Sequence, residues 1–357
     1  TSAIATMNPS TGIGNSYIGN GAVVDSNRIY QTFNIPTYQY PIDFDVNGNS
    51  YGHQITNNLI GGNTETAPNI TGTLTNGKSD GEMVAIYVNT GNAPDSVSST
   101  SIQGNKIKNI LLSGTGWDNF VGIRVENGRV RIGDQTRNII GDSLITNNVE
   151  CRGGGSLASI TANSAIMGIW TQSTEEVVIA NNLVANLTAS APINGYCFVD
   201  AIAHGSNLYY NDILYNTAGG KVTMRNNRVD FVLSASRLQN SAISSEGMMG
   251  YFVYTNSMNN VIENNVIINS GVNNLVNRNV RVYGMHFGVY GSAVNQGGRV
   301  NNNMMASLAN TATGDNTGTI MPELHAMVVA YGNWNVYNNQ IFLRNGTTGT
   351  PITNTNT

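Results

Sequence analysis

A six-residue pattern of apolar and polar positions recurs along the whole chain. An apolar residue is followed by two positions of any type, an asparagine, one further position and a second apolar residue. The pattern occurs nine times, first at 24–29 and last at 336–341, with starting points 31 to 47 residues apart, and only Glu150 interrupts the final apolar position. Its asparagines are Asn27, Asn58, Asn105, Asn148, Asn182, Asn227, Asn265, Asn303 and Asn339. Repetition at such periods is typical of solenoids, in which each repeat is one stacking unit.

A second segment with alternating apolar residues precedes most copies of this pattern. Examples are 42–46 (IDFDV), 84–88 (VAIYV) and 121–125 (VGIRV). A period of two predicts β-strands, and no stretch of the chain sustains the period of 3.6 that a helix would show. The unit 168–187 then reads as strand, polar turn, strand, asparagine turn and strand. We therefore expect short strands in every repeat and few helices.

One repeat cannot bury the apolar faces of its own short strands. Stacking the repeats about 4.8 Å apart would pair each strand with its equivalents in the repeats above and below. Asparagine suits the corner between two strands, because it tolerates the left-handed backbone conformation. Its side-chain amide can also hydrogen-bond to the next asparagine along the stack. We predict that the nine asparagines form one ladder along a single corner.

The GIxx…VxIxNNxI signature, clearest at 168–187, resembles the right-handed parallel β-helix of the pectate-lyase-like superfold. It is most similar to the asparagine-rich β-helix repeat regions of large secreted bacterial surface proteins. The resemblance implies an all-β, right-handed parallel β-helix of about nine or ten coils, with long loops on one side. We assign 1–20 to a degenerate first coil or N-terminal extension, 21–345 to the β-helix and 346–357 to a polar linker or tail. Residues 130–140 fit the pattern poorly and are interpreted as a further partial coil.

Composition narrows the classes of function. The chain has 357 residues, a net charge of −4 and only 11 % charged residues, while Asn (55) and Gly (40) are abundant and 40 % of the residues are hydrophobic. This excludes the basic face of a nucleic-acid-binding protein. No apolar run approaches the roughly 18 residues that a membrane span needs. Because the chain starts at Thr1 without Met or a signal peptide, we interpret it as a processed or excised piece of a longer gene product. Cys151 and Cys197 either form one disulfide or stay free.

A row of outward-facing side chains on the second kind of segment is the candidate binding site. Aligning these segments gives Asp45, Tyr87, Arg124 and Trp170, with Tyr290 and Tyr331 one or two positions later in their repeats. Such a row would follow a sugar chain by stacking and hydrogen bonding. The alternative, which we favour, is that loops cover these aromatic side chains and bury them.

Asp43 and Asp45 are the first candidates for catalysis, because positions i and i+2 of a strand face the same side. Paired carboxylates can bind Ca²⁺ or serve as acid and base in glycoside hydrolysis. Asp200 with His204 is the second candidate and Glu323 with His325 the third, whereas His286 is isolated. For all of them we favour a hydrogen-bonded structural role, and we expect no cofactor or metal.

These observations predict a non-enzymatic extracellular module, structural or adhesive, of a larger bacterial cell-surface or filament protein. Its partners would be a glycan or neighbouring copies or domains, with no nucleic acid and no membrane insertion. Two alternatives stay open: a polysaccharide lyase or glycoside hydrolase acting on an outer sheet face, and a carbohydrate-binding β-helix without catalysis. The fold hosts all of these functions and does not choose among them.

Overall fold

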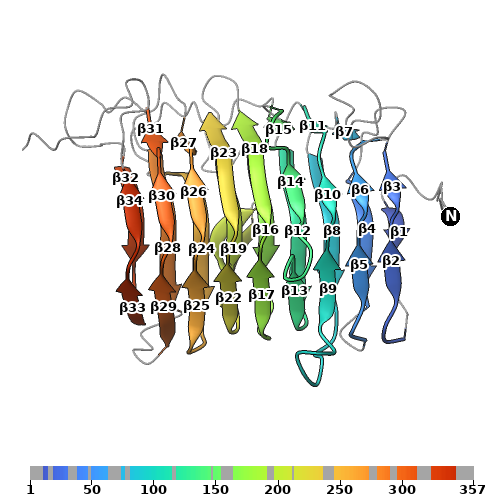
Figure 1. Ribbon diagram of the computed structural model, residues 1–357. Coiled ribbons are helices and arrows are strands. Elements are labelled where there is room, and N and C mark those ends of the chain that lie inside the picture. The colour runs from blue at the N-terminus through green and yellow to red at the C-terminus, as the bar shows by residue number, and fades with distance from the viewer. Residues whose placement is uncertain are drawn as a thin grey trace, which may run out of the picture.

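The computed structural model describes residues 11–14, 19–30, 38–46, 50–62, 74–76, 81–114, 118–145, 148–153, 164–190, 197–210, 213–235, 245–272, 280–289, 296–311 and 323–342. Within these ranges there is no helix, and the strands form a parallel β-helix of nine coils (Figure 1). Each coil contributes one strand to each of three parallel sheets. The all-β solenoid predicted from the repeat pattern is therefore confirmed.

The first sheet contains the longest strands and forms one side of every coil. Its members, in spatial order, are β1 (Thr11–Gly14), β4 (Tyr40–Asp45), β8 (Gly81–Asn89), β12 (Asp118–Asn127), β16 (Ser164–Thr171), β19 (Cys197–His204), β24 (Ser245–Thr255), β28 (Val280–Val289) and β32 (Glu323–Val329). This order follows the chain, so each coil lies directly against the next, from the blue to the red end of Figure 1.

The second sheet follows in each coil after a polar turn. Its members are β2 (Val23–Asp25), β5 (Gln54–Thr56), β9 (Thr100–Gln103), β13 (Val130–Ile132), β17 (Val177–Ala180), β22 (Val222–Arg225), β25 (Asn260–Glu263), β29 (Gly297–Asn301) and β33 (Asn333–Tyr337). Between the first and second strands of the sixth coil, β20 (Ser206–Tyr210) and β21 (Ile213–Thr217) form an antiparallel hairpin.

The third sheet begins after the asparagine corner. Its main path consists of β3 (Arg28–Ile29), β6 (Leu59–Ile60), β10 (Lys106–Ile107), β14 (Ile139–Gly141), β18 (Leu183–Ser190), β23 (Arg228–Ala235), β26 (Val266–Ile268), β30 (Met304–Ala306) and β34 (Gln340–Phe342). A side path extends it with β7 (Leu74–Asn76), β11 (Ile110–Leu112), β15 (Val149–Arg152), β27 (Gly271–Val272) and β31 (Ala309–Asn310). Strands β18 and β23 are long enough to belong to both paths.

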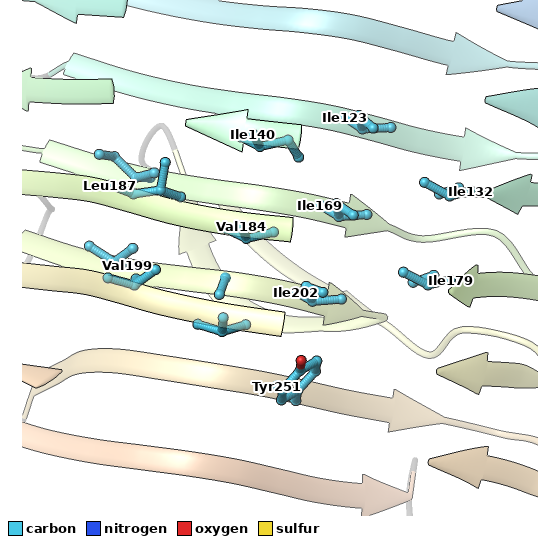
Figure 2. Close-up of a cluster of buried hydrophobic side chains, with 14 of the residues drawn as sticks. Ile123, Ile132, Ile140, Ile169, Ile179, Val184, Leu187, Val199, Ile202 and Tyr251 are labelled. Atoms are coloured by element: carbon cyan, nitrogen blue, oxygen red, sulfur yellow. The ribbon is translucent and has the colours of Figure 1, made fainter. Parts of the chain in front are cut away.

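Columns of apolar residues in register fill the interior. In the first sheet, for example, Ile123, Ile169, Ile202 and Tyr251 occupy equivalent positions, and all four are fully buried (Figure 2). One position earlier, a column of small residues runs through the sheet: Ala85, Gly122, Gly168, Ala201, Gly250, Gly284 and Ala326. A Cβ atom at Gly168 would lie 2.4 Å from the Ala201 carbonyl oxygen and 2.7 Å from Val184 Cγ1. Ala201 and Ile202 are consecutive in β19 and both belong to the core cluster, so side chains do not strictly alternate between the inner and outer face at this point of the strand.

An unbroken asparagine ladder runs along the corner between the second and third sheets. At seven of the eight steps the Oδ1 atom of one asparagine accepts hydrogen bonds from the backbone N–H and the Nδ2 of the asparagine one coil earlier, at 2.9–3.1 Å. At the step from Asn138 to Asn182 the Nδ2 bond, at 3.0 Å, makes the link. Its members are Asn27, Asn58, Asn105, Asn138, Asn182, Asn227, Asn265, Asn303 and Asn339. The ladder asparagines also donate to backbone carbonyl groups, so the corner satisfies its own polar groups.

The prediction was wrong for one member of the ladder, since the fourth coil uses Asn138 and not Asn148. Asn148 lies immediately before β15 of the side path, where it exchanges hydrogen bonds with Asn109 at 3.0 and 3.1 Å. The corner of the fourth coil is longer, because Asn138 follows the core residue Ile132 by six positions, whereas Asn105 follows Ile102 by three. Residues 130–140 are consequently the second strand, enlarged corner and third strand of the fourth coil, and not a partial coil.

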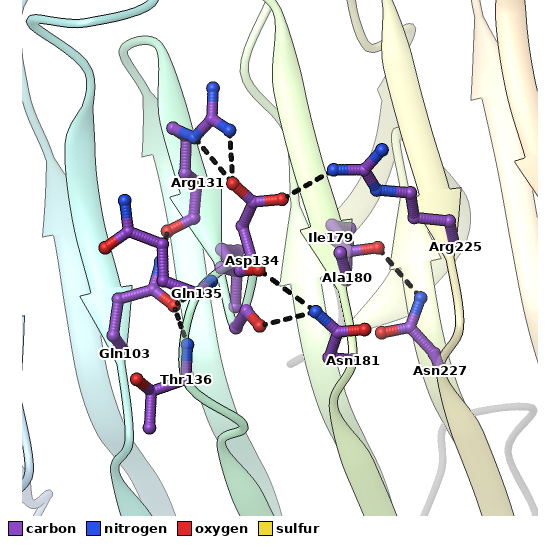
Figure 3. A network of polar contacts seen from close by, with 12 residues as sticks. Gln103, Arg131, Asp134, Gln135, Thr136, Ile179, Ala180, Asn181, Arg225 and Asn227 are labelled. Atoms are coloured by element: carbon purple, nitrogen blue, oxygen red, sulfur yellow. Dashed lines mark hydrogen bonds and ion pairs between the residues drawn. The ribbon is translucent and has the colours of Figure 1, made fainter.

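Hydrogen bonds and ion pairs hold this enlarged corner against the outer face of the second sheet (Figure 3). The Asp134 carboxylate binds Arg131 of its own coil, and Arg225 two coils further on at 2.9 Å. Burial opposes ionisation of Asp134, but these two arginines outweigh it and lower the pKa of the carboxyl group. Asn181 Nδ2 donates to the carbonyl oxygens of Gly133 and Asp134 at 3.3 and 3.0 Å. The insertion is therefore an ordered part of the solenoid surface.

Two neighbouring residues share the work at most corners that we had predicted for a single asparagine. One adopts the left-handed conformation, and the next makes the ladder hydrogen bonds. Outside the enlarged fourth corner, the residue before the ladder position adopts the left-handed conformation, as at Asn57, Asn181, Asn226, Asn264, Asn302 and Asn338, with φ between 55° and 60°. A second stack of left-handed residues marks the third sheet: Asn109, Asn186, Phe231, Asn269 and Ser307. In this second stack Phe231 has a φ of 50° and is 44 % exposed, which is an unfavourable conformation for a bulky side chain.

Candidate functional site

The outer face of the first sheet carries the predicted row of side chains. Register places Asp43, Tyr87, Arg124, Trp170, Ala203, Phe252, His286 and Val328 in one column. Asp43 occupies the position that the sequence analysis gave to Asp45, which instead pairs with Asn89 and accepts a hydrogen bond from its Nδ2 at 3.0 Å. Tyr331 lies beyond β32 and is 67 % exposed, while Tyr290 falls outside the described residues.

The centre of the row is closed by contacts among its own members. Trp170 is fully buried and Arg124 is 7 % exposed. The Arg124 guanidinium carbon lies 4.7 Å from the centre of the Trp170 ring and 5.6 Å from that of the Tyr87 ring, on neighbouring strands. The same guanidinium pairs with Glu126 at 2.5 Å and with Glu82 at 3.8 Å. The cation–π contacts therefore cover one face of each ring, and the fully buried Trp170 offers no surface on which a sugar could stack.

The N-terminal end of the row remains partly open to solvent. Tyr40, Asp43, Asp45 and Tyr87 are each half-buried, and the Tyr87 hydroxyl donates to Glu126 Oε2 at 2.6 Å. Burial, and next the neighbouring Asp45 charge, raise the pKa of the Asp43 carboxyl group. Burial also raises the pKa of both tyrosines, so their hydroxyl groups stay protonated at neutral pH. This acidic and aromatic patch, named here the Asp43 patch (Tyr40, Asp43, Asp45 and Tyr87), can donate and accept hydrogen bonds.

Asp200 and His204 do not form a pair in the fold. Asp200 is in register with Met167 and Met249 of the outer cluster, whereas His204 is in register with Val253 of the core. His204 is fully buried, with Nδ1 2.8 Å from Thr171 Oγ1 and Nε2 2.9 Å from the Gly220 carbonyl oxygen. Burial lowers its pKa to about 4. With both ring nitrogens engaged and no charge at neutral pH, His204 links two turns and cannot serve as a solvent-accessible base.

Glu323 and His325 belong to a cluster of rings that the sequence analysis did not foresee. The Tyr283 ring centre lies 5.2 Å from that of His325 and also 5.2 Å from that of His286, which in turn lies 5.6 Å from Phe252. Glu323 accepts from His325 Nε2 at 2.9 Å and pairs with Arg281 at 3.1 Å. The hydrogen bond from His325, and the positive charge of Arg281, lower the pKa of Glu323. His286 is therefore not isolated, although only its contacts with neighbouring coils reveal this.

The cysteine thiols and a possible metal-binding cluster are the remaining candidates. Cys151 and Cys197 are fully buried thiols that are not joined in a disulfide, and burial raises the pKa of Cys151 well above its usual value. Among the described side chains, no three His, Cys, Asp or Glu residues are arranged to hold a metal ion. In the described ranges we also find no helix of the length and apolarity needed to cross a lipid bilayer.

Comparisons with protein-family models, with curated proteins and with solved structures found no match to this chain.

Proposed function

We propose that this protein is a non-enzymatic structural module, and that it belongs to a larger extracellular assembly such as a bacterial cell surface or filament. The observation that carries the proposal is the asparagine ladder, which links every coil from Asn27 to Asn339 through side-chain hydrogen bonds that are buried at all but the two end steps. A continuous ladder on three parallel sheets makes a stiff rod with few sites for local opening.

The state of the candidate catalytic groups supports the same proposal. His204 is buried and fully hydrogen-bonded, Arg124 is held between two rings and two carboxylates, and Glu323 is paired with His325 and Arg281. Each of these groups stabilises contacts between coils. A catalytic set would instead converge on one solvent-accessible point.

Two experiments test this function. The purified protein is incubated with a panel of neutral and acidic polysaccharides, and the folded chain is subjected to limited proteolysis. We expect no release of reducing ends or unsaturated products, together with strong resistance to proteases within the coils. Turnover of any polysaccharide, lost in an Asp43→Asn variant but retained in Asp95→Asn, would contradict the proposal. Asp95 is a suitable control, because it is an exposed carboxylate in a turn between β8 and β9.

The Asp43 patch favours glycan recognition as a second candidate function. Its carboxyl groups and half-buried tyrosine side chains are the types that hydrogen-bond and stack on sugars. In a glycan-array experiment, a bound glycan should be lost on Tyr87→Ala and retained on Asp95→Asn. An array without signal, or equal binding by both variants, counts against this candidate.

A further inference from the structure

The ninth coil exposes positions that are completely buried in the coil before it. One core-register residue from each sheet illustrates this: Val329 of β32, Val336 of β33 and Ile341 of β34 are 44, 44 and 47 % exposed. Their register partners in the eighth coil, Phe287, Val300 and Met305, are all 0 % exposed. Tyr337 and Phe342 add 46 and 49 % exposed side chains. The last described coil therefore presents an apolar cross-section of the solenoid, at the red end of Figure 1.

The backbone at this end is also open to further pairing. Among the described strands, β32, β33 and β34 pair on one side only, with β28, β29 and β30. Open sheet edges in soluble proteins are ordinarily protected by charged residues or proline. Residues 323–342 contain one formally charged side chain, Glu323, and no proline. Within these described residues the edge therefore has few of the charges, and none of the prolines, that oppose strand addition.

The asparagine ladder gives the open end a direction. Asn339 Nδ2 donates to the Val300 and Tyr337 carbonyl oxygens, and within the described residues no asparagine Oδ1 accepts from it. At the opposite end Asn27 donates to Asn58, and no donor to Asn27 Oδ1 lies in the described part of the chain. The ninth coil thus lies at the donor end of the ladder and the first coil at its acceptor end. Asn182 Nδ2, which has the same two kinds of carbonyl partner as Asn339 Nδ2, also donates to the next Oδ1. A coil added in continued register would join them as at every other step.

We propose that the ninth coil docks on the first coil of a second copy of this chain, head to tail. The three edges β32–β34 would pair in parallel with β1–β3 of the second copy, and Asn339 would donate to its Asn27. Val329, Val336 and Ile341 would then be covered as Phe287, Val300 and Met305 are covered within one chain. Such a heterologous contact does not close on itself and builds a linear filament. The proposal rests on the structural role proposed above and names its partner.

Sedimentation velocity over a wide range of protein concentration tests this contact. We expect the mean mass to rise with concentration, and electron microscopy of concentrated samples should show rods of constant width. Val336→Glu and Ile341→Glu place an unpaired carboxylate in the contact and should each weaken association by about a hundredfold or more. Val97→Glu is the matched control, because Val97 is 93 % exposed in a turn away from both ends, and should associate as the parent does.

A mixing experiment separates head-to-tail docking from other contacts. The Ile341→Glu protein keeps an intact first coil, and an Ile29→Glu protein keeps an intact ninth coil. Each alone should remain monomeric, while an equimolar mixture should form dimers and nothing larger. Thermal melting followed by circular dichroism verifies that the variants are folded, and Tyr30→Glu, at a 44 % exposed position, replaces Ile29→Glu if the latter fails. A parent protein that is monomeric at every concentration, or a mixture without dimers, overturns the docking proposal. The polysaccharide and proteolysis results test the structural role separately.

Discussion

Asn138 Oδ1 lies 2.9 Å from the backbone nitrogen of Asn105 and 3.1 Å from its Nδ2. This contact carries the ladder across the one coil whose corner is enlarged. The three extra residues project outward, where Asp134 holds them, so the asparagine returns to register. The asparagine therefore stays in register with its neighbours although the length of the corner changes. This indicates that the ladder determines how the coils stack.

Substitutions of two neighbouring asparagines at one corner should change the free energy of unfolding by different amounts. Asn227→Ala removes hydrogen bonds to Ile179 and Asn265 and leaves buried groups of Asn182 without their acceptor, so we expect a loss of about 3 kcal/mol in the free energy of unfolding. Asn226→Gly keeps the left-handed conformation (φ 55°), so we expect the free energy of unfolding to change by less than about 0.5 kcal/mol. Urea unfolding measures both; equal losses would show that the ladder bonds are not what stabilises the corner.

Replacing Phe231 should stabilise the protein. Its φ of 50° costs a bulky residue about 1 kcal/mol, and the phenyl ring is 44 % exposed, so little burial is lost with it. Phe231→Asn restores the residue type found at Asn186 and Asn269 and should raise the melting temperature. Phe231→Ala leaves a β-carbon in the same conformation without the polar group and serves as the control. A lower melting temperature for Phe231→Asn would indicate that the ring makes a stabilising contact.

Alanine substitutions at two members of the predicted binding row should affect the stability of the protein differently. Trp170 is completely buried against Arg124, so Trp170→Ala should cost about 3–5 kcal/mol. Tyr331 is 67 % exposed, and Tyr331→Ala should cost less than about 0.5 kcal/mol. Chemical denaturation of the two variants distinguishes a packed residue from a surface residue. A Trp170→Ala protein as stable as its parent would mean that the ring is not part of the packing.

Acid should destabilise the fold through His204. Its pKa falls from the ordinary value of 6.5 to about 4 in the folded chain because the ring is buried. Between these two values the unfolded chain binds a proton that the folded chain does not, so stability falls as pH is lowered from 6.5 to 4, by up to about 3 kcal/mol. Burial shifts the pKa of His53 and His286 in the same direction, so they add to the slope. In urea titrations at several pH values, His204→Gln should show a smaller decline than the parent; an identical decline would exclude this residue as its cause.

Local patterns predicted the recurring strands of the repeat and eight of the nine ladder positions, because these depend on residues within one repeat. They did not predict the side-path strands or the β20–β21 hairpin. Asn148 was misassigned because its hexapeptide fits the pattern, although Glu150 in the final apolar position was a signal against it. The opposite faces of Asp200 and His204 were not predictable from alternation, since Ala201 and Ile202 both face the core. Likewise, nothing local to Arg124 indicates that the rings on either side of it come from the two neighbouring coils.

The amino-acid sequence alone determined that this chain forms an all-β solenoid with an asparagine corner, because strand alternation and turn chemistry are properties of a few consecutive residues. Only the tertiary structure decided which asparagine occupies the fourth step, that Trp170 and Arg124 are buried, and that Val336 and Ile341 remain exposed at one end. The physical reason is that every side chain here has its neighbours in the adjacent coils, 31 to 47 residues away in the chain. Pairing between coils therefore sets its burial and its partners.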